Sequence, residues 1–286
     1  MYIGFLTRVA KTLFFLTLPM TGACTWAGQT TKETVINAAS HYGPDHFKLS
    51  AEIPANLEFT SKAHYSPSPG ESCKFYSSGL GGAVTRKQQK TDHAPAKTTE
   101  QTVSFDIPLI FYISDCTMKL TKVDTFISGS YGPTPMDVGE DSGGISIRDS
   151  STSQKHDSVL SKDLVFRGLC TWKFQLSRAR IEQDGISKIL SCAAADATFG
   201  TSNDIYSERK PGGFVQRNEL AGKEIVMRYK LAREEQPGSK ETWGKVDAGW
   251  KPCIETDKTI RCQTPPVFKT FKMNGRECTV YPGCTE

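Results

Sequence analysis

Cys170-Thr171-Trp172-Lys173-Phe174-Gln175-Leu176 is the clearest structural pattern in this 286-residue chain. Every second residue of the stretch is apolar or cysteine, and the residues between them are polar. A period of two places alternate side chains on opposite faces of a β-strand. The stretch therefore predicts a half-buried strand with a cysteine on its inner face.

Similar strand patterns lie on the N-terminal side of this stretch. Val103–Ile107 alternates, and Pro108 separates it from the apolar run Leu109–Ile113. Phe47–Phe59 is interrupted by Pro54, which favours an edge strand or two short strands because proline cannot donate to a sheet ladder. These segments predict a mainly β protein.

Two tight hairpins are indicated by turn dipeptides between strand-like runs. Asp184-Gly185 precedes Ile186–Leu190, and Asn274-Gly275 lies between Phe268–Phe271 and Cys278–Tyr281. Asp-Gly and Asn-Gly favour primed turns, whose twist matches that of paired strands.

Helical signals are confined to the N-terminal region. The capping-box spacing Thr30–Glu33, followed by apolar residues at helical intervals, predicts a short helix over 31–41 that stops at Gly43-Pro44. Thr85–Thr102 and Gly132–Ser158 are polar, which is typical of flexible segments. Gly132–Ser158 is predicted to be a long loop or a boundary between the two halves. The predicted fold is a disulfide-stabilised antiparallel sandwich or barrel of one or two units. Its N-terminal β region spans 28–157 and its C-terminal disulfide-rich β region spans 158–286.

The first residues have the pattern of an export signal. Arg8 and Lys11 come before the apolar run Leu13–Met20, and small residues follow it. Cleavage after Ala27 would give a leader of residues 1–27. A lipoprotein box would instead give a leader of residues 1–23 and an acylated Cys24, which would anchor the chain to a membrane.

Cys24 is either removed or acylated, so eight cysteines can pair in both cases, an even number in an exported chain that predicts up to four disulfides. Cys253 and Cys262 are spaced to close one short loop, and Cys278 and Cys284 another. Zinc is the alternative, but the chain has no C-x-x-C pair and no histidine beyond position 156. The predicted disulfide cysteines are Cys73, Cys116, Cys170, Cys192, Cys253, Cys262, Cys278 and Cys284.

Charge gives no sign of a nucleic-acid partner. Without the leader, 33 basic and 31 acidic side chains remain, a nearly balanced set. We therefore expect contact with a membrane only through a lipid anchor at Cys24. The expected location is the periplasm or cell envelope of a bacterium, with anchoring to the outer membrane as an option.

No catalytic, cofactor or metal pattern emerges from the sequence. Asp141–Gly144 resembles the D-S-G-G of trypsin-like serine proteases over four residues only. That family also needs a histidine in an A-A-H-C context, and none of the upstream histidines has it: His41, His46, His64 and His93. We expect no enzyme activity and no cofactor.

The predicted function is non-catalytic binding of a protein in the envelope, of the immunity-protein or hydrolase-inhibitor type, with a toxin or hydrolase as partner. Trp243 and Trp250 are the candidate binding anchors, because tryptophan dominates interface hot spots. The alternative for both rings is packing in a small core. A surface adhesin, sugar-binding or structural envelope component is the second functional class, and a hydrolase with dispersed carboxylates is the third.

Substitution of Cys24 by Ala separates the two leader hypotheses. If Cys24 is acylated, the variant loses the acyl mass and leaves the membrane fraction, as intact-mass spectrometry and fractionation would show. If cleavage follows Ala27, the mature mass and the location of the protein stay the same.

Overall fold

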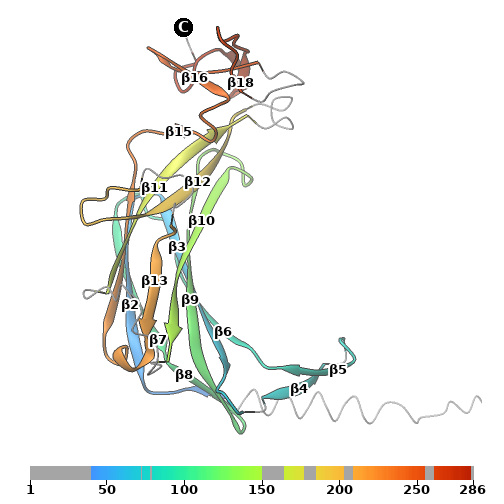
Figure 1. Cartoon of the computed structure of the whole chain (residues 1–286), viewed down its shortest axis with the longest axis vertical. Helices are drawn as coiled ribbons and strands as arrows, with labels where there is room; N and C mark the ends of the chain where they lie inside the picture. Colours follow the sequence, from blue (N-terminus) through green and yellow to red (C-terminus); the bar gives the residue numbers. More distant parts are fainter. Residues whose placement is uncertain are drawn as a thin grey trace, which may run out of the picture. The chain divides into compact units, whose positions relative to one another are not determined.

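The protein is mainly β, as the sequence predicts (Figure 1). The only helix among the described residues is a single 3₁₀ turn, η1 (Arg217–Glu219). No helix in the described part of the chain has the length and apolar content needed to cross a membrane. The computed structural model describes residues 40–71, 73–77, 79–149, 164–176, 185–202, 209–254 and 261–284.

The predicted helix over 31–41 falls outside the described residues except at its end. There the chain is extended, because His41 and Tyr42 form strand β1 (His41–Tyr42), which pairs with β8. The described residues therefore do not show the helix.

Two large sheets and three small ones make up the described part of the chain. Sheet A has seven strands: β1, β3 (Leu57–Pro67), β6 (Gln88–Ala94), β8 (Ile110–Ile113), β9 (Cys116–Ser130), β10 (Val138–Arg148) and β13 (Gly212–Gln216). Sheet B has six strands: β2 (His46–Ile53), β7 (Gln101–Pro108), β11 (Val165–Gln175), β12 (Ser187–Ala195), β14 (Glu224–Leu231) and β15 (Gln236–Pro237). The three small sheets are hairpins: β4 (Lys74–Ser77) with β5 (Gly82–Thr85), β16 (Trp243–Val246) with β17 (Gly249–Pro252), and β18 (Phe271–Met273) with β19 (Arg276–Cys278).

The sheets are mixed rather than purely antiparallel. β14 runs parallel to both β11 and β2, and β13 runs parallel to β10. The chain repeatedly passes from one sheet to the other, so strands far apart in sequence become neighbours. For example, β2 and β3 belong to different sheets although they follow each other directly around Pro54.

Apolar side chains on the facing surfaces of the two sheets form the core. Phe59 of sheet A lies 6.4 Å from Phe105 and 6.1 Å from Tyr229 of sheet B, measured between ring centroids. Burial alternates along β3, as expected when one face of a strand covers a core. The sheets are not closed into a barrel, so the barrel alternative is wrong.

Two polar segments whose composition is typical of flexible segments contain strands. Residues 138–148 form β10, which pairs with β9, and residues 88–94 form β6, which pairs with β3. β6 and the first half of β10 show no apolar alternation, because glycine and charged side chains occupy many of their inward positions. Gly139, Asp141 and Gly143 are the examples on β10.

The predicted boundary near residue 157 lies outside the described residues. Strands from before and after it pair in both large sheets, as β10 does with β13 and β2 does with β14. Residues His41–Glu286 form one compact unit.

Several local predictions are confirmed. β11 covers the alternating stretch that begins at Cys170, and the hairpin at Asn274-Gly275 joins β18 to β19 with φ of 51° and 74° at the two turn residues. The first residue of the other turn, Asp184, lies outside the described residues. All four disulfides are formed: Cys73–Cys116, Cys170–Cys192, Cys253–Cys262 and Cys278–Cys284.

Replacing Gly143 by Ala should weaken the contact between β10 and the chain that leads into β13. A Cβ atom at this position would overlap the Pro211 carbonyl oxygen, a backbone atom that cannot move aside cheaply. We expect a loss of about 1–3 kcal/mol in the free energy of unfolding, measured in urea with the disulfides intact. Gly79→Ala is the control, because a Cβ at Gly79 meets nothing within 4 Å. Equal midpoints for the two variants would contradict the close approach.

Candidate functional site

The strands of the β4–β5 hairpin pair with each other, as in the other two hairpins, but none of its described residues joins the aromatic core cluster to which those two contribute. Phe75 lies opposite Val84, and Ser77 lies opposite Gly82, so the hairpin is narrow and short. Gly81 adopts a φ of +65° in the turn, a conformation that glycine accepts without steric cost. We call Lys74–Thr85 the finger.

The base of the finger is fixed to sheet A. Cys73 is bonded to Cys116, the first residue of β9. The Glu71 carboxylate accepts a hydrogen bond from the Thr117 amide, and the Ser68 amide donates to the Thr117 carbonyl over 3.1 Å. These contacts hold both the chain that enters the finger and the strand on which it rests.

The return strand is held at the same place. The Arg86 amide donates to the Cys73 carbonyl over 2.7 Å, which closes the base of the finger. The Arg86 guanidinium also lies 4.9 Å from the centroid of the Phe75 ring, within the range of a cation–π contact. The finger is therefore anchored at its base, both covalently and by hydrogen bonds.

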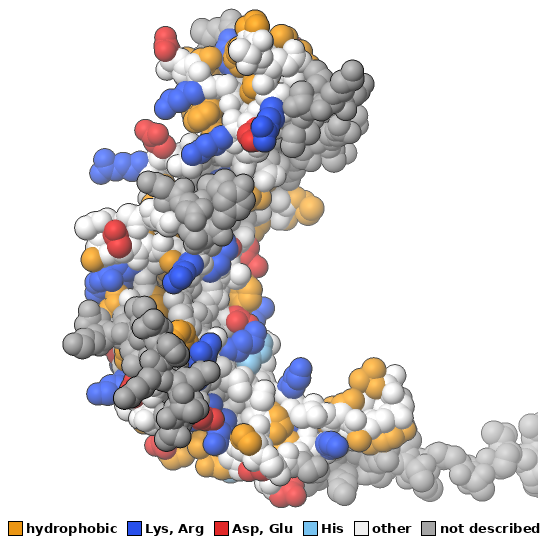
Figure 2. Space-filling view, in the orientation of Figure 1, with side chains coloured by type: hydrophobic (Ala, Val, Ile, Leu, Met, Phe, Trp, Pro, Cys, Tyr) orange, Lys and Arg blue, Asp and Glu red, His pale blue; other side chains and the backbone are white. Residues whose placement is uncertain are grey.

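The tip of the finger is apolar and exposed. Leu80 is 75% exposed and Tyr76 is 57% exposed, although large apolar side chains normally find partners in a folded domain. Figure 1 shows the hairpin lying clear of the two large sheets, and Figure 2 shows hydrophobic side chains gathered on it. Exposed apolar clusters of this kind mark interaction sites.

Cations outnumber anions on the finger and its flanks. Lys74 lies on the finger and Arg86 and Lys87 directly follow it, whereas Glu71 lies at its base and Lys90 is paired with Asp92. The full chain is nearly balanced, with 35 basic and 31 acidic residues. The finger thus combines an apolar tip with a base of net positive charge.

A metal site at the base is disfavoured by the chemistry of its donors. Glu71, Cys73 and Cys116 bring one donor atom each within 4.8 Å of one another. Thiolates are the cysteine species that bind metals, and both sulfurs here are joined in a disulfide. In this state the cluster offers only the Glu71 carboxylate.

Trp243 lies in a core. It is 4% exposed and belongs to a cluster with Phe174, Phe271 and Tyr281; its ring centroid is 4.8 Å from that of Phe174. Trp250 is half-buried at the rim of the same cluster. The sequence allows Trp243 to be either a binding anchor or part of a small core. In the structure its ring packs in a core.

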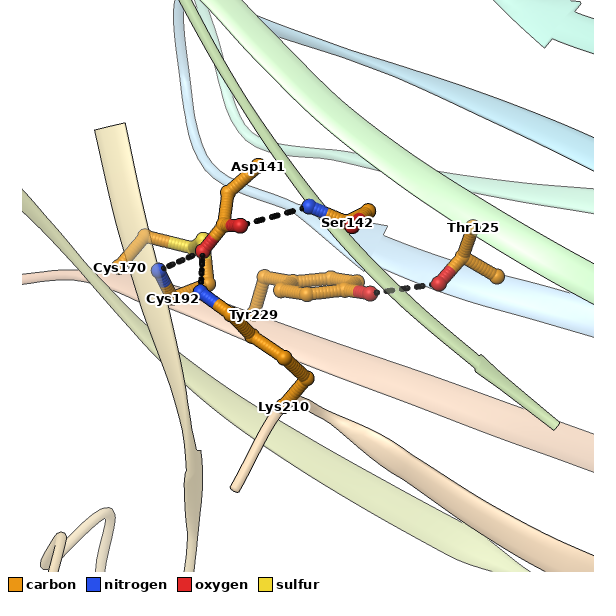
Figure 3. Close-up of a disulfide and its surroundings, with 7 residues drawn as sticks. All are labelled: Thr125, Asp141, Ser142, Cys170, Cys192, Lys210 and Tyr229. Atoms are coloured by element: carbon orange, nitrogen blue, oxygen red, sulfur yellow. Dashed lines mark hydrogen bonds and ion pairs between the residues drawn. A yellow bond between two sulfur atoms is a disulfide. The ribbon is translucent and has the colours of Figure 1, made fainter. Parts of the chain in front are cut away.

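Asp141 of the D-S-G-G stretch bridges the two sheets. It lies on β10, and its carboxylate accepts hydrogen bonds from the Ser142 amide at 2.8 Å, from the Cys192 amide, and from the Lys210 ammonium at 2.6 Å (Figure 3). Nearby, burial raises the pKa of the Tyr229 hydroxyl to about 12. The Asp141 carboxylate is bonded to backbone amides and a lysine. It therefore links strands and does not form part of a protease triad.

No family model, curated protein or solved structure matches the chain. Geometry is therefore the only guide to function. Sequence reasoning missed the finger. Its only sign in the sequence is Phe75-Tyr76, two residues after Cys73, followed by three glycines within the four residues from Gly79.

Truncation of Trp243 should destabilise the protein. Trp243→Ala removes a buried ring from the aromatic cluster, which costs about 3–5 kcal/mol in a typical core, whereas Trp250→Ala should cost clearly less because that ring is half-buried. Denaturant unfolding followed by circular dichroism measures both. A Trp243→Ala variant as stable as the parent would show that the ring is not part of the core.

Proposed function

We propose that this protein is an exported, non-catalytic binding protein whose finger docks into a cleft of a protein partner. The observation that supports this proposal is an exposed apolar tip, formed by Tyr76 and Leu80, on a hairpin whose base is fixed by a disulfide. This layout suits a protein that occludes its partner, as immunity proteins and hydrolase inhibitors do.

The energetics of the finger favour this mode of binding. Complete burial of a leucine side chain contributes about 1.5–3 kcal/mol, and Leu80 offers most of its surface for burial. Binding usually loses free energy when loops must become ordered, and a base fixed by Cys73–Cys116 reduces that loss. Tyr76 adds the type of rigid aromatic anchor that is enriched in interface hot spots.

The charge of the finger defines the partner surface. Lys74, Arg86 and Lys87 complement an acidic rim, and such complementarity accelerates association and selects among partners. Catalytic clefts of glycoside hydrolases carry a pair of carboxylates, so their surfaces have the required sign. A hydrolase of this kind, or a toxin with a similar cleft, is the partner we propose.

Disulfide content agrees with this setting. Four disulfides indicate an oxidising compartment, outside the cell or in the periplasm. We place the protein in the bacterial cell envelope, with acylated Cys24 as the alternative that would anchor it to the outer membrane.

Photo-cross-linking from the finger tests the proposal. A photoreactive phenylalanine analogue at position 80, in mature protein applied to the envelope fraction of the producing cells, should yield one discrete protein adduct. Adding Tyr76→Asp should reduce that adduct about tenfold or more, because a buried carboxylate without a partner is costly.

The matched control places the same analogue at position 136, since Met136 is 78% exposed and lies outside the finger. It should give no adduct of the same mass. Equal adducts from both positions, or none from position 80, would contradict docking by the finger. An adduct with lipid alone would show that the tip meets a membrane instead.

A further inference from the structure

A cavity of about 410 Å³ opens where β2 ends and β7 begins. Its walls come from Glu52 on β2, Glu100 and Thr102 at the start of β7, Arg228 and Lys230 on β14, and Phe199 in the loop after β12. The volume lies within the range of about 300–1,000 Å³ that small-ligand sites occupy. No residue of the finger lines this cavity.

Phe199 is held over the cavity in a strained conformation. Its φ of +66° is unusual for a bulky residue, and such strain concentrates at ligand-binding positions. The strain is maintained by Asp196, whose carboxylate accepts hydrogen bonds from the Thr198 amide at 2.8 Å and the Gly200 amide at 2.8 Å. Hydrogen bonds from Thr198 and Gly200 also hold the pKa of Asp196 below its usual value, which keeps the carboxylate ionised.

The aromatic ring is placed beside hydrogen-bonding groups. Phe199 is half-buried, and the Lys230 ammonium lies 4.2 Å from its ring centroid. The Arg228 guanidinium, also in the cavity lining, is bonded to the Glu52 carboxylate at 2.9 Å. The cavity lining therefore combines an aromatic ring with charged and polar groups.

Charges in the cavity wall cancel. Two carboxylates, Glu52 and Glu100, face two cations, Arg228 and Lys230. This balance gives no net attraction for an anion or for a cation, but it supplies both acceptors and donors for hydroxyl groups. A neutral ligand with many hydroxyls and one apolar face matches the walls best, and a pyranose ring has that form.

We propose that this cavity is a binding site for a neutral saccharide, with a sugar ring packed on Phe199 and its hydroxyls bonded to Glu100 and the Glu52–Arg228 pair. The site is separate from the finger and adds a carbohydrate-recognition function to protein docking. It gives the protein a means of holding a glycan of the envelope.

Ligand-observed NMR on the intact mature protein tests the site. The probes are neutral mono- to trisaccharides of glucose, galactose, mannose and N-acetylglucosamine, each at 10 mM, with inorganic phosphate and the dipeptide alanylalanine as charged comparisons. At least one neutral saccharide should show saturation transfer, and phosphate and the dipeptide should leave its signal unchanged when added as competitors.

Phe199→Asn is the decisive variant, because asparagine tolerates positive φ and the turn should stay folded without the ring. We expect saccharide affinity to fall about tenfold or more while the thermal midpoint does not decrease. Glu100→Gln should also weaken binding, since it replaces an exposed carboxylate without changing its size.

The control is Phe214→Ala, which removes another half-buried ring in a cation–π contact, the one with Arg148 at 4.6 Å. It should leave saccharide binding unchanged. The proposal is overturned if no saccharide binds, if Phe199→Asn binds as tightly as the parent, or if phosphate or the dipeptide displaces the sugar.

Discussion

The close approach of β10 to sheet B is the constraint on which the rest of the fold depends. A Cβ at Gly139 would lie 2.8 Å from the Leu190 amide nitrogen, so no other residue fits there without displacing backbone. Between Gly139 and Gly143, the Asp141 carboxylate accepts a hydrogen bond from the Cys192 amide. β10 of sheet A is thereby joined to β12, an edge strand of sheet B, and elsewhere in the core the ring of Phe59 fills the space between the two sheets.

This junction also explains how far the fold was predictable. Strands with apolar inner faces, such as β11, are readable because burial imposes a period of two. The first half of β10 cannot be recognised as a strand from its sequence. Its inward positions hold glycine and a paired carboxylate, which are residue types typical of loops. The mixed strand pairing cannot be predicted locally either, because no local sequence pattern indicates that β14 lies between β2 and β11.

The candidate sites were hidden for different reasons. Tryptophan is as well suited to a core as to an interface, and only the packing around Trp243 distinguishes the two. Leu80 is an ordinary residue whose importance comes from having its surface uncovered, a property of the folded chain. The position of the Phe199 ring depends on a positive φ that is held by hydrogen bonds to Asp196. The residue types in this segment do not predict that angle.

Different contacts hold the two proposed sites in place. The finger is bonded to Cys116 on β9, the strand that pairs with β3, β8 and β10 and is thus the most constrained in sheet A. Phe199 follows β12, an edge strand of sheet B, so the sheet alone cannot fix it; the hydrogen bonds to Asp196 do so locally. Because the anchors share no residue, occupation of one site has no direct mechanical path to the other. Binding at the two sites should therefore be additive in free energy, as it is for distant groups without common partners.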